Sequence, residues 1–362
     1  MPRKLRVGLI LGTRPEIIKL SPLIRLLKKN RADFFLIHSG QHYSFEMDRL
    51  FFKELDLPAP EEKLGIRADQ VLGHAGHVGR MMTAIERILL KRRPGVVYVQ
   101  GDTNTVLAGA LAASKIAGVR IGHVEAGLRS YDRAMPEEIN RMMADHVSDF
   151  LFTPTTGAKK ILLGEGISPK KIFVTGNTIV DAVYQNLKVA QRKIRLQTKT
   201  PFMLLTLHRQ ENVDSPLRLG RIMQGLERVA RKTTLPILFP MHPRTGKNLK
   251  RFRIRLAKGL GVQKPAGFLE FLKMENEAKL ILTDSGGVQE EACILHVPCV
   301  TLRTSTERPE TLAGGANRLV GYDPGRIASA ALAALQQKRN WTNPFGDGHA
   351  SERILRSSGV LS

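Results

Sequence analysis

Three acidic residues stand at or just after the ends of segments that have the pattern of buried strands. Asp102 closes the apolar run Gly95–Gln100, and Glu125 follows Arg120–Val124. Glu137 comes slightly later, at the start of a predicted helix. Each alone has an ordinary explanation, because acids are frequent helix caps and are favourable in a first helical turn. Three of them near adjacent strand ends indicate acid–base chemistry with more than one proton carrier.

A second group of residues has the composition of a phosphate-binding turn. The apolar segment Ala278–Leu282 is followed by Thr-Asp-Ser-Gly-Gly and then by a predicted helix. Such a turn presents unpaired backbone N–H groups at the positive end of the helix dipole. Ser285 adds a hydroxyl, Gly286 and Gly287 carry no Cβ, and Glu291 lies where it could bind a ribose diol. A tight turn with a solvated glutamate explains this segment equally well when it is taken alone.

A comparable turn near the N-terminus favours the phosphate interpretation. The strand-like run Leu5–Leu11 is followed by the segment Gly12–Glu16. Pro15 fits the first turn of a helix, where its missing N–H is not needed. Arg14 and Lys19 place cations beside that helix start, although an ordinary turn with surface charges would look similar. Two such turns in two halves of one chain predict the two walls of a cleft.

Histidine and arginine side chains follow predicted strands in the second half of the chain. His208 and Arg209 come directly after Phe202–Leu207, where they would suit a phosphate leaving group. Arg308 follows a later strand and adds a cation at the same edge. His242 also follows a predicted strand, but we interpret it as a buried, hydrogen-bonded core histidine.

Strand-like and helix-like segments alternate along the whole chain, which predicts parallel sheets with helices on both faces. The expected strands are Leu5–Leu11, Asp33–His38, Gly95–Gln100, Arg120–Val124, Asp149–Phe152, Lys171–Val174, Phe202–Leu207, Pro236–Pro240, Lys279–Leu282 and Cys299–Leu302. The helix-length segments include Pro15–Lys29, Val106–Ala117, Pro136–His146 and Ser215–Lys232. We therefore predict two doubly wound α/β domains, residues 1–176 and 177–343. Ligands of such sheets bind beyond the carboxyl ends of the strands, where the candidate residues lie.

Length and composition exclude several classes of protein. The 362 residues, 42% of them hydrophobic, are enough for two globular domains. No apolar run approaches the ~20 residues that span a bilayer, and the N-terminal apolar stretch lacks a cleavage-site pattern. The two cysteines, Cys293 and Cys299, provide neither a disulfide framework nor a cysteine metal cluster. We expect a cytoplasmic protein without membrane attachment.

The net charge of +23 raises nucleic acid as a partner. The densest basic run, residues 247–258, contains only Phe252 for base stacking and no known nucleic-acid-binding motif, so we interpret it as a solvated helix face. G-x-G-x-x-G after the first strand and G-x-x-x-x-G-K-[ST] are both absent, which argues against a dinucleotide cofactor and a P-loop. His74 and His77 have metal-ligand spacing, but no third ligand stands out, and we interpret them as part of a surface helix. We expect no specific nucleic acid, cofactor or metal.

Taken together, the motifs resemble those of the non-hydrolysing UDP-N-acetylglucosamine 2-epimerases. They are G-T-R-P-E at 12–16, Q-G-D-T at 100–103, H-V-E-A-G-L-R at 123–129, P-E-E at 136–138, N-R at 140–141, G-N-T at 176–178, H-R-x-E-N at 208–212, D-S-G-G-V-Q-E-E at 284–291 and E-R-P-E at 307–310. Each motif is weak alone, whereas the ordered set is specific. The resemblance implies two Rossmann-like domains around a central cleft, as in GT-B glycosyltransferases. It also implies a C-terminal helix, at about residues 344–362, that packs back on the first domain.

The resemblance further implies a reaction and a set of residue roles. The family interconverts UDP-N-acetylglucosamine and UDP-N-acetylmannosamine by eliminating UDP and adding it back to 2-acetamidoglucal, which feeds cell-surface polysaccharide synthesis. Asp102, Glu125 and Glu137 match its acid–base carboxylates, and His208 matches a histidine at the diphosphate. The residues implied to bind substrate are Arg14, Lys19, Ser285, Gly286, Gly287, Glu291 and Arg308.

Many bacterial members of this family use a second UDP-N-acetylglucosamine as an activator. This chain has Tyr43 and Ser44 where those members carry an arginine and a longer polar residue, so the resemblance leaves activation open. The loop Ser130–Met135 is also shorter than in many bacterial members. Candidate activator contacts are Gln41, His42, Arg209 and His242. We expect a homodimer.

Other functions are compatible with the same motifs. A GT-B glycosyltransferase would use the same nucleotide pocket, but it would need an acceptor site and would not need three clustered carboxylates. A sugar-nucleotide sensor would keep the pocket without the chemistry, and the retention of all four predicted catalytic residues argues against it. A 2-epimerase of a modified UDP-N-acetylglucosamine remains open, because the sugar-facing residues do not fix the sugar.

Overall fold

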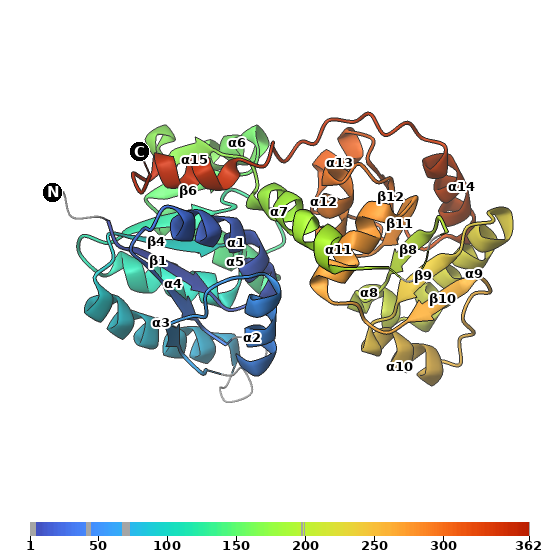
Figure 1. Cartoon of the computed structure of the whole chain (residues 1–362), viewed down its shortest axis with the longest axis horizontal. Coiled ribbons are helices and arrows are strands. Elements are labelled where there is room, and N and C mark those ends of the chain that lie inside the picture. Colours follow the sequence, from blue (N-terminus) through green and yellow to red (C-terminus); the bar gives the residue numbers. More distant parts are fainter. Residues whose placement is uncertain (1–4, 41–44, 67–72, 197, 199, 362) are drawn as a thin grey trace. The chain divides into compact units, whose positions relative to one another are not determined.

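The computed structural model describes residues 5–40, 45–66, 73–196, 198 and 200–361. The chain divides into two compact units (Figure 1). Unit 1 comprises Met1–Tyr184 together with Phe345–Ser362, and unit 2 comprises Gln185–Pro344. The boundary falls inside helix α7 (Thr178–Lys193). Each unit is a parallel sheet with helices packed against it, which confirms the predicted fold class.

Unit 1 contains a seven-stranded sheet in the order β3-β2-β1-β4-β5-β6-β7, and neighbouring strands are parallel throughout. The strands are β1 (Val7–Leu11), β2 (Phe34–His38), β3 (Glu62–Lys63), β4 (Val96–Gln100), β5 (Arg120–Val124), β6 (Phe150–Thr153) and β7 (Ile172–Val174). Every residue of β1 and β4 is buried, because helices cover both faces of the sheet at its centre.

Helices connect these strands and cover the sheet. They are α1 (Arg14–Lys29), α2 (Phe45–Glu54), α3 (Gly73–Arg92), α4 (Asn104–Ser114), α5 (Pro136–Val147), α6 (Thr156–Gly164), the 3-10 helix η2 (Pro169–Lys171), the first part of α7, and α15 (Ala350–Ser357). On one face, Met81 and Ile85 of α3 pack with Val106 of α4 and Ile10 of β1. Among the helices of the described residues, none is both long and apolar enough to cross a membrane.

Unit 2 repeats this architecture with six parallel strands in the order β10-β9-β8-β11-β12-β13. The strands are β8 (Met203–Thr206), β9 (Ile237–Pro240), β10 (Leu260–Gln263), β11 (Leu280–Thr283), β12 (Cys299–Thr301) and β13 (Asn317–Leu319). The helices are α8 (Gln210–Val213), α9 (Pro216–Lys232), α10 (Pro243–Arg251), α11 (Phe268–Glu277), α12 (Gly286–Ile294), α13 (Pro309–Ala313) and α14 (Pro324–Leu335).

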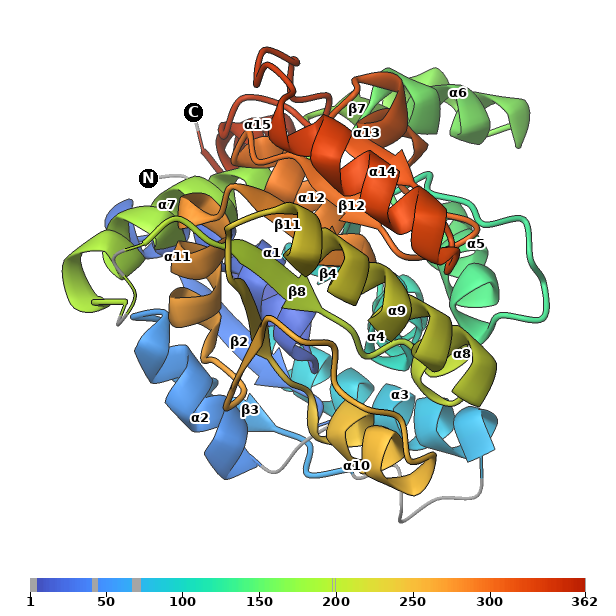
Figure 2. The ribbon, with the colours of Figure 1, turned by 90° about the vertical axis from the view of Figure 1, so that its right-hand side faces the viewer.

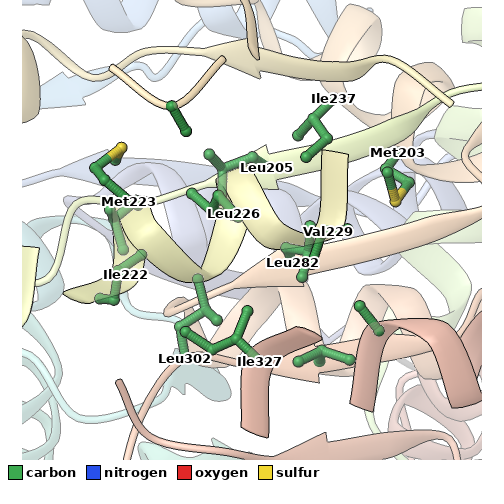
Figure 3. Packing of buried hydrophobic residues seen from close by; sticks show 14 of the residues in the cluster. Met203, Leu205, Ile222, Met223, Leu226, Val229, Ile237, Leu282, Leu302 and Ile327 are labelled. Carbon is green, nitrogen blue, oxygen red and sulfur yellow. The ribbon is translucent and has the colours of Figure 1, made fainter. Parts of the chain in front are cut away.

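The core of unit 2 shows why these helices dock on the sheet. Buried apolar residues recur along α9 at helical spacing, with Ile222, Met223, Leu226 and Val229 on one side. They pack against the sheet and against Ile327 (Figure 3), which belongs to α14, the helix beside α9 (Figure 2). Burial of each such side chain contributes roughly 1.5–3 kcal/mol, so this stripe dominates the docking of α9.

Both sheets have a point at which the strand order reverses. In unit 1 the chain builds β1, β2 and β3 in one direction and then returns to add β4 on the other side of β1. In unit 2 the same reversal separates β8 from β11. Ligands of open α/β sheets bind beyond the carboxyl ends of the strands at such points. The residues that follow β1, β4, β8 and β11 therefore occupy the expected ligand-binding edges.

All ten strands expected from the sequence occur, with ends shifted by at most two residues. Three further strands, β3, β10 and β13, were not predicted. β3 has two residues and β13 has three, while three of the four residues of β10 are exposed. None of the three forms an apolar run, and pairing with a longer neighbour is what makes each of them a strand.

The C-terminal segment belongs to unit 1, where α15 packs beside α1 (Figure 1). The buried carboxylate of Asp181 accepts hydrogen bonds from the backbone N–H groups of Ala350 (3.2 Å) and Ser351 (2.9 Å), at the first turn of α15. Burial raises the pKa of Asp181. The phenol of Tyr98 in β4 meets the hydroxyl of Ser358 at the other end of the helix. These residues attach α15 to the core of unit 1.

We predict that Asp181→Ala lowers the free energy of unfolding by about 2 kcal/mol, because two buried N–H groups lose their acceptor. Urea denaturation followed by circular dichroism measures this change. Glu352→Ala is the matched control: its side chain lies on the same helix, is 44% exposed, and its loss should change stability by less than about 0.5 kcal/mol. Wild-type stability of Asp181→Ala would show that other contacts hold α15.

Candidate active site

The loop that follows β1 closes on the carboxylate of Glu16. This side chain is 1% exposed and accepts hydrogen bonds from the backbone N–H groups of Gly12 (2.5 Å) and Thr13 (2.9 Å), so it caps the start of α1. The hydroxyl of Thr103, which follows β4, also donates to Glu16. Burial raises the pKa of Glu16 to about 7 against the effect of these hydrogen bonds. Gly12 is required here, because a Cβ would lie 1.9 Å from Ser39 Oγ.

Glu125 is the point at which three segments of unit 1 meet. Its carboxylate accepts two hydrogen bonds from Lys19 of α1 (2.6 and 2.7 Å), one from Gln100 of β4 (2.5 Å) and one from Asn177, just before α7 (3.0 Å). Glu125 is 8% exposed and has a φ of 72°, a left-handed conformation that glutamate rarely adopts. Such strain persists where the surroundings enforce it, often at functional sites. Two predicted site residues, Lys19 and Glu125, thus form one ion pair.

Asp102 follows β4 and belongs to an adjoining ion-pair network. Its carboxylate contacts Arg141 of α5 (2.5 Å), and Arg141 also contacts Glu138 (2.7 Å). The side-chain amide of Asn140 donates to the main-chain carbonyl of Asp102 (2.9 Å). The interpretation of Asp102 as a helix cap is wrong, because the N-cap of α4 is Thr103, whose hydroxyl accepts a backbone N–H of the first turn.

The two glutamates that open α5 have different surroundings. Glu138 is 2% exposed and accepts hydrogen bonds from the backbone N–H (2.9 Å) and hydroxyl (2.9 Å) of Ser130 and from the backbone N–H of Tyr131 (3.0 Å). Burial opposes the charge of Glu138, but these bonds and Arg141 outweigh it and lower its pKa. Glu137, the predicted catalytic residue, is exposed. Glu137 is therefore the carboxylate of this pair that a ligand can reach.

Asp284 organises the strand ends of unit 2. It is fully buried after β11 and accepts hydrogen bonds from the backbone N–H groups of His208 (3.1 Å to each oxygen) and Arg209 (2.9 Å). The side-chain amide of Asn212 also donates to it (3.3 Å). The Nδ1 atom of His208 lies 3.5 Å from Asp284 Oδ1. Burial lowers the pKa of His208 against the opposing charge of Asp284, which favours a neutral imidazole.

Helix α12 begins directly after Asp284. Ser285 is its N-cap, Gly286 is buried and Gly287 is exposed. A Cβ placed on Gly286 would lie 3.8 Å from a terminal guanidinium nitrogen of Arg209 and 3.7 Å from a carboxylate oxygen of Glu307. The helix start is thus flanked by an arginine, and the combination of helix N-terminus and arginine suits a phosphate group.

Two further arginines in unit 2 are held by carboxylates. Arg303, 7% exposed, contacts Glu211 (2.8 Å) and Glu307 (2.9 and 3.0 Å). Burial opposes the charge of Glu307, but Arg303 overcomes this and holds the pKa of Glu307 at about 2. The predicted substrate contact Arg308 lies 2.8 Å from Glu290, a buried residue of α12. The E-R-P-E motif is therefore tied to the same helix as the D-S-G-G motif.

Glu291 is partly buried on α12 and lies near a second carboxyl group that the sequence did not suggest. Glu275 of α11 is 1% exposed, and burial together with the charge of Glu291 raises its pKa well above the usual range. Two carboxyl groups in this relation do not both ionise readily, and the raised pKa of Glu275 favours its neutral form. An acidic residue on the apolar side of a helix was the one available signal for Glu275.

The interpretation of His242 as a core histidine is wrong, and of the two histidines on α3, His74 is exposed as expected whereas His77 is buried. His242 is exposed rather than buried, because it caps α10 by accepting the N–H of Arg244 (3.2 Å). Its ring centroid lies 5.9 Å from that of His208. His77 is 3% exposed, because its side of α3 turns toward the carbonyl of Ile66 (3.3 Å), while the other side of this helix is at the surface. Within the described parts of the chain, no group of three or more His, Cys, Asp or Glu could hold a metal.

The positions of the remaining predicted site residues are as follows. Arg14 begins α1, with its guanidinium 5.7 Å from the ring centroid of Phe51 in α2. Gln41 and His42 lie outside the described residues. We use the name unit 1 cluster for the predicted site residues of unit 1, which are Arg14, Lys19, Asp102, Glu125 and Glu137; among them, Lys19 and Glu125 are in direct contact. The unit 2 cluster contains His208, Arg209, Ser285, Gly286, Gly287, Glu291 and Arg308.

The raised pKa of Glu16 should make the stability of the fold depend on pH. Folded Glu16 binds its proton with a pKa of about 7 instead of 4.5, so the folded chain holds more protons between these values and loses stability as pH rises through them. Relative to Glu16→Gln, the wild type should lose about 3 kcal/mol between pH 4.5 and 7. Urea denaturation at several pH values measures this difference.

The control for this series is Glu270→Gln, which alters an exposed carboxylate in unit 2. The free energy of unfolding of this variant should vary with pH in the same way as that of the wild type. Parallel pH profiles for the wild type and Glu16→Gln would contradict the assignment of a raised pKa to Glu16.

Comparison with known proteins agrees with the motif resemblance. A family model described as UDP-N-acetylglucosamine 2-epimerase matches residues 25–358. A UDP-N-acetylglucosamine 2-epimerase of Methanocaldococcus jannaschii is 53% identical over 363 residues, covering 97% of this chain and 98% of that protein. A UDP-2,3-diacetamido-2,3-dideoxy-D-glucuronate 2-epimerase of Pseudomonas aeruginosa is 40% identical, covering 97% of this chain and 98% of that protein.

A solved structure is similar over the same extent. The crystal structure of the M. jannaschii UDP-N-acetylglucosamine 2-epimerase, in complex with UDP-N-acetylglucosamine and UDP, has a TM-score of 0.83 and 52% identity, covering 97% of this chain and 99% of that chain. Because the family model covers most of the chain and these relatives match it almost from end to end, the chain belongs to the UDP-N-acetylglucosamine 2-epimerase family.

Proposed function

We propose that this protein is an isomerase that reversibly inverts C2 of UDP-N-acetylglucosamine to give UDP-N-acetylmannosamine, without hydrolysis. The observation that carries the proposal is the end-to-end similarity to enzymes of that name, 53% identical in the case of M. jannaschii. The chemistry of the two clusters supports it, because the unit 2 cluster suits a diphosphate and the unit 1 cluster suits proton transfer. The product would supply N-acetylmannosamine units for cell-surface polysaccharides.

The proposed reaction is an elimination followed by a re-addition. The C2 proton of the sugar is not acidic, because the ring carries no carbonyl. A base removes this proton while the C1–O bond breaks and UDP leaves with the bonding electrons, which forms the C1=C2 double bond of 2-acetamidoglucal. UDP then attacks C1 again, and an acid delivers a proton to the opposite face of C2. One proton is taken and one is returned, so the sequence needs neither oxidant nor reductant.

The unit 1 cluster would supply the proton carriers. Glu125 accepts four hydrogen bonds, including two from Lys19, so a proton reaches its carboxylate only when one of these donors moves. The carboxylate of Asp102 pairs with Arg141 and its side chain is 32% exposed, and Glu137 is exposed as well. Asp102 and Glu137 are thus the more accessible acid–base groups, and the ammonium of Lys19, which Glu125 holds in place, would stabilise negative charge that develops near C2.

The unit 2 cluster would bind UDP. The N-terminus of α12 and Arg209 would hold the diphosphate, and Glu291 would accept hydrogen bonds from the ribose hydroxyls. Because burial favours the neutral form of His208, this imidazole would donate a hydrogen bond to the departing phosphate rather than form a permanent ion pair with it. A weak contact in the bound substrate that strengthens as charge develops favours departure of UDP.

A modified UDP-N-acetylglucosamine is the second candidate substrate. The observation that favours it is the P. aeruginosa relative, 40% identical, whose name gives a diacetamido uronate sugar. Both substrates contain UDP and an acetamido group at C2, so the same clusters would serve either one. The higher identity to the M. jannaschii enzyme favours the unmodified sugar.

Proton NMR of the purified protein with UDP-N-acetylglucosamine alone, in deuterated water, tests this function. We expect signals of UDP-N-acetylmannosamine with deuterium at C2, because the proton removed from one face exchanges with solvent before re-addition. Formation of UDP and free sugar without a second UDP-sugar would indicate hydrolysis instead. No reaction would contradict the proposed substrate, and conversion of the diacetamido uronate analogue would then support the second candidate.

We predict that Asp102→Asn, Glu125→Gln and Glu137→Gln each lower turnover by roughly 10²–10⁴ while UDP affinity stays close to that of the wild type. Asp102→Asn and Glu137→Gln each remove a proton carrier, and Glu125→Gln removes the carboxylate that holds Lys19 in place. Initial rates measured by NMR and UDP titration by calorimetry separate the two quantities.

Glu291→Ala provides the matched control in the unit 2 cluster. It should weaken UDP binding, because the ribose hydroxyls lose their acceptor, while the proton carriers are unchanged. Wild-type turnover in all three carboxylate variants would remove the acid–base assignment. Unchanged UDP affinity in Glu291→Ala would remove the ribose assignment.

A further inference from the structure

A buried histidine–aspartate pair adjoins the loop that carries Asp102. His123 of β5 and Asp145 of α5 are each 1% exposed. The Nδ1 atom of His123 lies 2.7 Å from Asp145 Oδ1, and its Nε2 atom lies 2.8 Å from the carbonyl oxygen of Gly101. The reaction described above gives neither side chain a role, although both ring nitrogens have short hydrogen bonds.

Both ring nitrogens of His123 face atoms that accept hydrogen bonds. The Gly101 oxygen is a carbonyl and has no proton to donate. Asp145 is a carboxylate, because its second oxygen faces Arg129 (2.8 Å) and the N–H of Gly127 (3.2 Å). A neutral imidazole has one N–H and would leave a lone pair facing one of these acceptors. The ring therefore carries two N–H groups and a positive charge.

The charges around the pair are balanced. Asp145 lies between His123 and Arg129, and Arg129 also contacts Glu165 (2.7 and 2.6 Å). Burial opposes the charge of His123 most strongly, but Asp145, the two hydrogen bonds and the charge of Glu125 together raise its pKa. Within this network each cation, His123 and Arg129, thus has a carboxylate in direct contact, which is the arrangement that makes buried charges tolerable.

The hydrogen bond between His123 and the Gly101 carbonyl acts on the peptide group that directly precedes Asp102. Gly101 has a φ of 86°, donates its N–H to the carbonyl of Val124 (3.1 Å) and accepts from His123. Asn140 holds the carbonyl of Asp102 itself (2.9 Å). The peptide groups on both sides of the Asp102 Cα are therefore held, which fixes the direction of its Cα–Cβ bond, and Arg141 holds the carboxylate itself.

We propose that His123 is a permanently protonated positioning residue, which holds the Gly101 carbonyl through its Nε2–H and thereby orients Asp102 for proton transfer. Asp145 keeps the ring charged and fixes its plane. The catalytic consequence rests on the function proposed above. The protonation state of His123 does not, and it is measured separately.

The first test is NMR of the wild-type protein labelled with ¹⁵N-histidine, with the His123 signals assigned from their absence in His123→Asn. We expect both ring nitrogens to carry protons from about pH 6 to pH 9, whereas an ordinary histidine loses one proton with a pKa near 6.5. A single ring N–H, or a titration inside this range, would overturn the proposal.

The second test compares two variants that each keep one half of the contact. In His123→Gln the amide reaches the position of Nε2 and still donates to Gly101. In His123→Asn the shorter amide reaches only the position of Nδ1 and meets Asp145. Both variants remove the charge. We expect kcat to fall roughly 10- to 100-fold in His123→Asn and within about threefold in His123→Gln, with UDP affinity unchanged in both.

Equal kcat values in the two variants would overturn the positioning role, because a merely structural histidine would not distinguish which contact is kept. A loss of UDP affinity that matches the loss of kcat would overturn it as well. Circular dichroism checks that both variants fold, and if one does not, the NMR result on the wild type decides. If the wild type fails to convert UDP-N-acetylglucosamine, the proposed function fails, while the NMR result still decides whether His123 is charged.

Discussion

The organisation of unit 1 depends on the hydrogen bonds and the ion pair that the carboxylate of Glu125 makes. It joins Lys19 of α1, Gln100 of β4 and Asn177, so three segments distant in sequence converge on one buried charge. The side chains of Lys19 and Glu125 are 13% and 5% exposed, and removal of one partner of such a pair typically costs about 3–5 kcal/mol. The left-handed backbone of Glu125 is the conformational cost of bringing the carboxylate to this position.

Asp284 has the equivalent place in unit 2 but works through main-chain donors. It follows β11 and gathers the N–H groups of His208 and Arg209 after β8, which orders the residues that begin α8. A common physical reason underlies both cases. Polar N–H donors that are buried at the carboxyl ends of the strands need acceptors, and a buried carboxylate provides them: for side-chain donors at Glu125 and mainly for main-chain donors at Asp284. Each unit therefore fixes its strand ends with an acid and leaves nearby polar groups, such as Glu137 and Arg209, exposed.

The differences between prediction and structure have local causes. The short strands β3, β10 and β13 lack an apolar run, so pattern alone could not reveal them. Thr103, one residue beyond Asp102, caps α4, and this shift frees the aspartate for Arg141. The position of a histidine relative to a strand did not predict whether its side chain is buried. His242 follows a strand and is an exposed helix cap, whereas His123 lies within a strand and is a buried member of an ion-pair network.

The sequence by itself determined the fold class, ten of the strands and the family, because apolar periodicity and ordered motifs are local properties of the chain. It also determined which residues with useful chemistry follow the strand ends. Only the tertiary structure decided which of them are partners, namely Lys19 with Glu125, and Arg141 with both Asp102 and Glu138. It also decided that burial raises the pKa of Glu275. Burial and electrostatic pairing depend on distances between segments that are far apart in the sequence, and those distances exist only once helices and sheets have packed.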